Sequence, residues 1–322
     1  MKFRFTLLLF MTIICFVDAQ SYQGVTGIRD TSYSNRAAYR KHVKKYPNIK
    51  LVTPTVIEGI QTIRDTTYCS IGDRELKADL LLPESSNHIA LLFIHGGGWR
   101  SGNKGQHFPL AQQLASRGYT VLLPEYRLST EALFPAAVYD VKAAIRWVRK
   151  NSNALDIDPE KIVIGGFSAG GELAAFMGTT GNMPLFNGCN CNLEISSHVN
   201  AVIDVDGTLS FVHPESSEGN DSKRISAGTN WFGYPKKDNF GLWQAASPLF
   251  YVGPATPATL FLNSSKASMH AGRDDYMMTL STFDIYNEAH EYEDSPHGFC
   301  LFQPWFDDVV ERMDKFMKTV MQ

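Results

Sequence analysis

The 322-residue chain is long enough for one large domain with a well-buried core, or for two small ones. Hydrophobic residues make up 44% of it and charged residues 20%, which is typical of a globular protein. The formal net charge of −3 gives no reason to expect nucleic acid or an anionic membrane as a partner.

The first 19 residues have the three parts of a secretory signal peptide. Lys2 and Arg4 supply the positive charge, Leu7–Val17 forms the apolar core, and small residues precede a cleavage site before Gln20. The apolar run is too short for a stable membrane span. We therefore expect residues 1–19 to be removed and the mature protein to be secreted or periplasmic, with no membrane association.

Residues 20–54 are polar, with one helix expected near Asn35–Lys45, and we interpret them as an N-terminal extension of a catalytic domain at residues 55–322. In an exported protein the cysteines that follow the signal peptide can form disulfides. The sequence leaves the pairing open among Cys69, Cys189, Cys191 and Cys300.

From residue 55 onward, strand and helix patterns alternate. Thr62–Ser70 and Glu75–Leu82 flank Ile71-Gly72-Asp73, which predicts a β-hairpin. Further strands are expected at 89–94, 120–123, 161–165, 201–205, 259–264 and 286–292, and helices at 109–116, 136–151, 274–283 and 309–321. This alternation predicts an α/β fold with a mostly parallel sheet and helices on both faces.

Residues 207–247 interrupt that alternation with a long segment rich in aromatic side chains. A loop region of this length is either disordered or functional, and its aromatic content argues against disorder. We interpret it as an inserted cap over the site, with Trp231 as a candidate for substrate binding. The alternative for each aromatic side chain is that it packs in a small core within the segment.

The functional prediction rests on the sequence Gly166-Phe-Ser168-Ala-Gly170, which follows an apolar strand and precedes a helix-forming stretch. A serine becomes nucleophilic when a tight strand-to-helix turn holds it exposed beside a base. Such a turn brings backbones together on both sides of the serine, so residues without a Cβ are required there. The pattern predicts Ser168 as the nucleophile.

Two further motifs supply the groups that a serine nucleophile needs. A His-Gly-Gly-Gly sequence follows the strand at 89–94, and the N–H groups of Gly97 and Gly98 are expected to form an oxyanion hole with that of Ala169. Trp99 is expected to form a wall of the acyl pocket. His297, in a Ser-Pro-His-Gly sequence, is the expected base.

With these motifs, the chain resembles the hormone-sensitive-lipase-like esterase group of α/β-hydrolases over about residues 55–320. Shorter stretches are similar to secreted bacterial carbohydrate esterases that deacetylate xylan or pectin; they are Asp206-Gly207, His213–Ser216, Met269–Asp274 and Phe302–Phe306. The resemblance implies an α/β-hydrolase fold and a Ser-His-Asp triad that works through an acyl-enzyme without a metal or cofactor.

The acid of the triad is the open position. Relatives in the wider esterase group carry an aspartate at the end of the penultimate strand, but residues 264–268 contain no carboxylate. Asp274 is our prediction because it lies in the loop after that strand. Asp275, its neighbour, and Asp206, directly after the preceding strand, remain the alternatives.

The sequence thus predicts a secreted serine esterase that removes O-acetyl groups from plant cell-wall polysaccharide, with acetylated xylan or xylo-oligosaccharides as the first choice of substrate. Pectin acetylesterase, feruloyl esterase and general short-chain carboxylesterase are the alternatives. A non-catalytic hydrolase-fold binding protein is more remote, because Ser168 and His297 are both present. The oligomeric state is not determined by the sequence.

Overall fold

The computed structural model describes residues 24–322 except 182, 189 and 190. The expected signal peptide at residues 1–19 and Cys189 lie outside the described residues. Within the described part of the chain, no helix combines the length and the apolar character needed to cross a bilayer.

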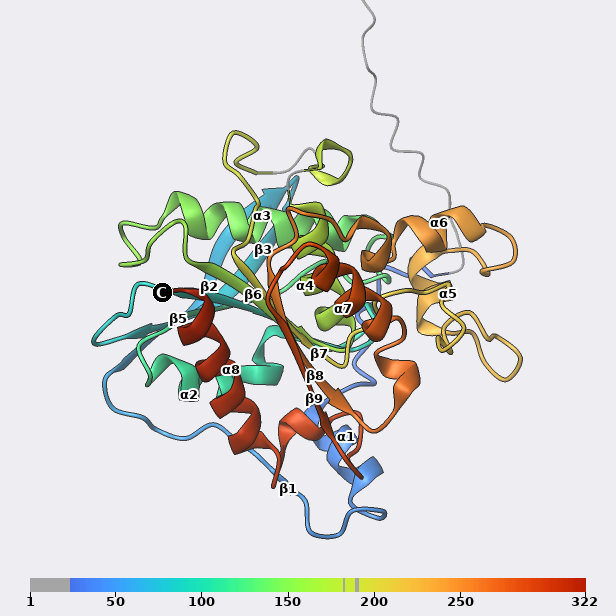
Figure 1. The fold of residues 1–322 in the computed structure, drawn as a ribbon, viewed down its shortest axis with the longest axis horizontal. Helices are drawn as coiled ribbons and strands as arrows, with labels where there is room; N and C mark the ends of the chain where they lie inside the picture. The colour runs from blue at the N-terminus through green and yellow to red at the C-terminus, as the bar shows by residue number, and fades with distance from the viewer. Residues whose placement is uncertain (1–23, 182, 189–190) are drawn as a thin grey trace, which may run out of the picture.

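An eight-stranded sheet forms the centre of the molecule, in the order β2-β3-β5-β4-β6-β7-β8-β9 (Figure 1). β3 runs antiparallel to both of its neighbours. The other six strands that follow it in the sheet, β4 to β9, are parallel to one another. The strands are β2 (Ile60–Ile71), β3 (Arg74–Pro83), β4 (Ala90–Ile94), β5 (Thr120–Pro124), β6 (Ile162–Phe167), β7 (Ala201–Val205), β8 (Ala258–Ser264) and β9 (Asn287–Tyr292).

Helices cover both faces of this sheet. One face packs against α2 (Phe108–Ala115) and α8 (Phe306–Val320), and the other against α3 (Ala136–Lys150), α4 (Ala169–Thr180) and α7 (Arg273–Thr282). Short 3-10 turns lie at Lys104–His107, Pro184–Phe186, Pro248–Tyr251, Ala267–Met269 and Phe299–Leu301.

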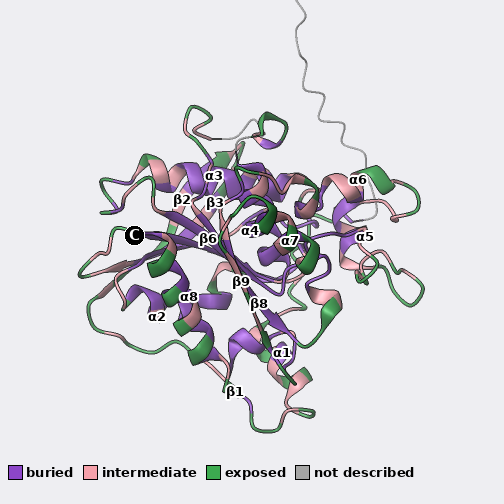
Figure 2. Cartoon of the chain, viewed as in Figure 1, coloured by how far each residue is buried: buried purple, intermediate pink, exposed green. Residues whose placement is uncertain are grey.

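The central strands are apolar throughout because both of their faces are covered. In β4, for example, Leu91 and Phe93 point into the core beneath α8, whereas Leu92 and Ile94 point into the core beneath α3 and α4. Successive side chains of a strand alternate between faces, so a strand buried on both sides has no polar period. Figure 2 shows the buried strands between the two layers of helices. The predicted α/β fold is confirmed, and the element ends differ from expectation by only a few residues.

The N-terminal extension packs onto the catalytic domain. Its helix α1 (Asn35–His42) begins after Ser34, whose side chain accepts the N–H of Ala37. Its strand β1 (Lys50–Leu51) pairs antiparallel with β10 (Phe302–Gln303), near the end of the chain. These contacts hold α1 beside the loop that carries His297, a position that the polar sequence of the extension does not reveal.

Residues 207–247 form a lobe with two short helices, α5 (Ala227–Phe232) and α6 (Phe240–Ala245). Trp231 is fully buried and stacks on Trp99 with 4.6 Å between ring centroids, and Phe211, Phe232 and Trp243 surround the pair. The expectation that Trp231 binds substrate is therefore wrong for this structure. Burial of these large aromatic rings stabilises the lobe, so Trp231 packs in its interior and is not exposed to a substrate.

Among the described cysteines, Cys69 of β2 forms a disulfide with Cys191, which lies in the segment after α4. Cys300 is a buried free thiol.

Candidate active site

Ser168 occupies the turn between β6 and α4, with φ 57° and ψ −119°. A Cβ at Gly166 would collide with the carbonyl oxygen of Gly170, and a Cβ at Gly170 would collide with the carbonyl oxygen of Ile94. The two glycines are thus required by backbone contacts on either side of the serine. This strained turn lifts the Ser168 hydroxyl above the carboxyl end of the sheet.

The structure brings Ser168 and His297 together and adds Asp206. The Ser168 Oγ lies 2.9 Å from His297 Nε2, and His297 Nδ1 lies 2.8 Å from Asp206 Oδ2. Asp206 is the first residue after β7, and His297 follows β9. All three residues sit at the carboxyl ends of parallel strands, where ligand sites of open α/β sheets form.

The surroundings of Asp206 favour its ionised form. It is 1% exposed, and its Oδ1 accepts the backbone N–H of Ser264 at 2.8 Å and lies 3.5 Å from His270 Nδ1. Burial raises the pKa of Asp206, but hydrogen bonds from His270 and His297 outweigh burial and lower this pKa to about 2. A buried carboxylate can therefore fix the His297 tautomer and stabilise its protonated form.

The prediction of Asp274 as the acid is corrected by this geometry. The Asp274 side chain is 79% exposed and accepts a hydrogen bond from Arg273 Nε at 2.8 Å. Asp275 is also exposed and faces His213 Nε2 at 3.5 Å. Because α7 begins at Arg273, both carboxylates belong to its first turn and point away from His297, where they suit the positive helix end.

The glycine loop lies against Ser168, and Gly97 and Gly98 line the cavity where an oxyanion is expected. Gly97 (φ 129°) and Gly98 (φ 61°) adopt backbone conformations that favour glycine. The carbonyl of Gly97 accepts both the N–H and the hydroxyl of Ser101, which anchors the loop. Within the described residues, the N–H groups of Gly97, Gly98 and Ala169 donate no hydrogen bond, so they are available to an oxyanion.

His95 and Gln106 hold the start of this loop. The Gly96 N–H donates to Gln106 Oε1 at 2.7 Å, and the buried His95 ring stacks on Tyr126. Burial lowers the pKa of His95 to about 4, so this imidazole is neutral at neutral pH. His95 is therefore a structural side chain that orients the loop.

Trp99 does not wall an acyl pocket, contrary to expectation. It is 4% exposed, and its Nε1 donates to Glu172 Oε2 at 2.9 Å, which ties the glycine loop to the first turn of α4. Burial raises the pKa of Glu172 well above its ordinary value, and it does the same for the nearby Asp204. Sequence reasoning missed both carboxylates, although Asp204 stands out as the only charged residue of the apolar strand β7.

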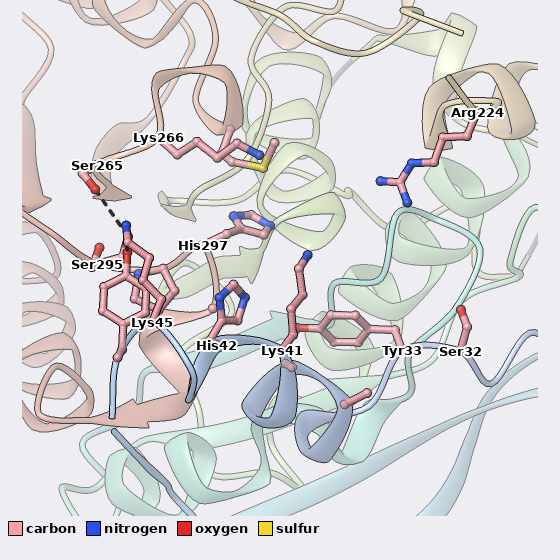
Figure 3. Close-up of a pocket in the computed structure, with 16 residues that line it drawn as sticks. Ser32, Tyr33, Lys41, His42, Lys45, Arg224, Ser265, Lys266, Ser295 and His297 are labelled. Atoms are coloured by element: carbon pink, nitrogen blue, oxygen red, sulfur yellow. Dashed lines mark hydrogen bonds between the residues drawn. The ribbon is translucent and has the colours of Figure 1, made fainter. Parts of the chain in front are cut away.

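The site opens into two adjoining cavities, and Figure 3 shows the one that His297 lines. One, of about 690 Å³, is lined by His297 and by the α1 region of the N-terminal extension. The other, of about 580 Å³, is lined by Gly97, Gly98 and polar residues of the 207–247 lobe. Both share Tyr33, Lys41 and Lys266, so the two cavities form one continuous site. In the part of the chain that the structure describes, no group of three or more His, Cys, Asp or Glu residues is arranged to hold a metal ion.

Comparisons with known proteins place the chain among esterases by sequence similarity. The BD-FAE family profile matches residues 78–270, more than half of the chain. Carboxylesterase NlhH of Mycobacterium tuberculosis is 39% identical over 92 residues, which cover 28% of this chain and 29% of that protein. Esterase LipQ of the same organism is 28% identical over 220 residues, covering 63% of this chain and 50% of LipQ. The chain thus spans at most about half the length of these curated relatives.

Solved structures show the same fold. Esterase 2 of Thermogutta terrifontis, in its apo form, is 26% identical with a TM-score of 0.65, covering 84% of this chain and 98% of that structure. A truncated carbohydrate esterase from gut microbiota is 23% identical with a TM-score of 0.66, covering 83% of this chain and all of that structure.

Proposed function

We propose that this chain, which belongs to the BD-FAE family, is a serine carboxylic ester hydrolase. The observation that carries the proposal is the continuous contact from Ser168 through His297 to the buried Asp206, beside three backbone N–H groups that no described residue accepts. A site that serves only the stability of the fold does not need a strained serine, an oxyanion site and an ionised buried acid side by side, whereas a serine hydrolase needs all three.

The reaction follows from these positions. Ser168 Oγ attacks the ester carbonyl while His297 Nε2 takes its proton, and the N–H groups of the glycine loop and Ala169 stabilise the oxyanion. His297 then returns the proton to the departing alcohol, which leaves an acyl-serine. Water, deprotonated by His297, attacks that acyl group, and release of the carboxylic acid restores the free serine.

The proposed substrate is an O-acetylated plant polysaccharide or its oligosaccharides, with acetylated xylan first and acetylated pectin second. The cavity beside the glycine loop favours a substrate whose alcohol part is polar, such as a sugar. The 207–247 lobe lines this cavity with Ser217, Glu218, Asn220 and Asn230. Export from the cytoplasm is part of the proposal, and the Cys69–Cys191 disulfide suits an oxidising compartment.

Release of acetate from acetylated polysaccharides and hydrolysis of p-nitrophenyl esters of increasing chain length test this function. Acetate esters should be cleaved far faster than octanoate esters, and Ser168→Ala should lower kcat by roughly 10⁴–10⁶-fold with an unchanged thermal unfolding midpoint. Equal turnover of the octanoate ester would indicate a lipase-like enzyme. An active Ser168→Ala variant, or a wild-type protein inactive on all esters, would refute the proposal.

A further inference from the structure

Three cationic side chains from distant parts of the chain surround the mouth of the site. Lys41 comes from α1, Arg224 from the 207–247 lobe, and Lys266 from the turn after β8. All three line both of the adjoining cavities. Figure 3 shows their charged ends pointing into the same space beside His297.

These three charges differ from the other cations of the lining. Within the described residues, Lys41, Arg224 and Lys266 form no ion pair, whereas two other cations of the lining do. Lys45 lies 3.8 Å from Asp294, and Arg100 lies 2.9 Å from Asp30. The lining therefore has an excess of positive charge, although the chain as a whole carries −3.

The acids of the lining do not compensate for these cations. Asp30 is occupied by Arg100, and Glu218 accepts the backbone N–H of Gly228 at 2.7 Å. Burial raises the pKa of Glu218. Both acids belong to the cavity beside the glycine loop, so the space in front of His297 is left to the cations.

The pKa of His42 is affected by the same positive charges. This side chain lines the cavity next to Lys41, and its pKa is lowered first by burial and then by the positive charges of Lys41 and Lys266. A positive region that disfavours another proton in this way favours a bound anion.

From this geometry we infer that the preferred ester substrate carries an anionic group, a sugar carboxylate as in uronic acids, which Lys41, Arg224 and Lys266 bind while the acetyl group lies at Ser168. This inference rests on the proposed esterase function and narrows its substrate class. Guanidinium and ammonium groups form charge-assisted hydrogen bonds with carboxylates, and unpaired cations at a cleft also raise the rate of encounter with anions. This inference reverses the order of the two substrates proposed above, because the cations should make acetylated oligogalacturonides better substrates than neutral acetylated xylan.

The inference also gives the N-terminal extension a function. Lys41, His42 and Tyr33 belong to residues 20–54, yet they form a wall of the cavity in front of His297. The extension therefore supplies part of the substrate site, and its charge determines part of the specificity.

The test compares kcat/KM for acetylated oligogalacturonides with kcat/KM for neutral acetylated xylo-oligosaccharides of equal length. The triple variant Lys41→Gln/Arg224→Gln/Lys266→Gln removes the cluster. Lys44→Gln is the matched control, because Lys44 is an exposed lysine just after α1 that does not line the cavities. Thermal unfolding establishes that each variant is folded.

Wild type should prefer the acidic substrate, and the preference should shrink as salt rises to about 0.5 M, since salt screens exposed charges. Each exposed cation–carboxylate contact changes affinity by up to about fivefold, so the triple variant should reduce the preference by roughly tenfold, mainly through KM. Lys44→Gln should keep the wild-type preference.

Inhibition of p-nitrophenyl acetate hydrolysis distinguishes the possible anions. Trigalacturonate should inhibit wild type competitively, and the triple variant should be inhibited about tenfold more weakly. Stronger inhibition by inorganic phosphate than by trigalacturonate would overturn the assignment to a carboxylate. Equal use of acidic and neutral substrates, or a preference that survives in the triple variant, would overturn the inference while hydrolysis of p-nitrophenyl acetate still supported the esterase function.

Discussion

Replacing Asp206 with asparagine tests whether Asp206, and not Asp274 or Asp275, is the acid of the triad. The two short contacts of the carboxylate are both with donors: Oδ2 lies 2.8 Å from His297 Nδ1, and Oδ1 lies 2.8 Å from the Ser264 nitrogen. An asparagine has one oxygen and one NH₂ group, so one of these donors must face another donor in either orientation. If the NH₂ group faces His297, the imidazole is driven to the tautomer that protonates Nε2 and cannot accept the Ser168 proton.

Asp206→Asn should therefore lower kcat by about 10³–10⁴-fold. KM should change little, because Asp206 is 1% exposed and lies behind His297. The conflict between buried donors should also lower the free energy of unfolding by about 1–3 kcal/mol. Steady-state hydrolysis of p-nitrophenyl acetate and urea unfolding measure the two effects.

Asp274→Asn is the matched control, because this carboxylate is 79% exposed and pairs with Arg273. Its activity should stay within about threefold of wild type, as expected for an exposed ion pair outside the site. An Asp206→Asn enzyme within about tenfold of wild type, or a collapse of activity in Asp274→Asn, would show that the reasoning is wrong.

Two further predictions concern stability. His107 is buried, neither ring nitrogen has a hydrogen-bond partner among the described residues, and burial lowers its pKa to about 3. Because the unfolded chain binds this proton below about pH 6.5 and the fold does not, acid should destabilise the protein, by about 2 kcal/mol at pH 5 from this side chain alone. His107→Phe should remove that part of the loss between pH 7 and pH 5 in urea unfolding, and an unchanged loss would contradict the assignment. The disulfide joins residues 122 positions apart, so Cys69→Ala/Cys191→Ala should cost about 2–4 kcal/mol, and unchanged urea midpoints would count against it.

The fold and the nucleophile could be predicted from the sequence because their causes are local. Strands buried on both faces appear as short apolar runs, and helices with one buried face appear as periodic stretches. The turn at Ser168 needs glycines at 166 and 170 because the backbones of Gly170 and Ile94 occupy the space of a Cβ. The histidine could be proposed from its motif and its place in the order of the chain.

The acid of the triad was decided by tertiary structure. In the sequence, Asp206 and Asp274 each follow a strand of the parallel sheet, and sequence distance does not state which of the two approaches His297. The start of α7 at Arg273 directs Asp274 toward solvent, whereas Asp206 sits directly on the end of β7 beside His297. Which aspartate meets His297 therefore depends on how close the ends of β7 and β8 lie to the loop after β9 in the folded chain.

Side-chain partners likewise required the assembled fold. Trp99 and Trp231 were expected at the substrate, but aromatic stacking and the hydrogen bond to Glu172 place them in the interior. The cations Lys41 and Lys266 are separated by more than two hundred residues in the sequence, yet they line the same cavity. Local patterns determine which elements form and which backbone turns are possible, because those depend on neighbouring residues. Only the packing of distant segments decides which side chains are buried and which charges meet at the site.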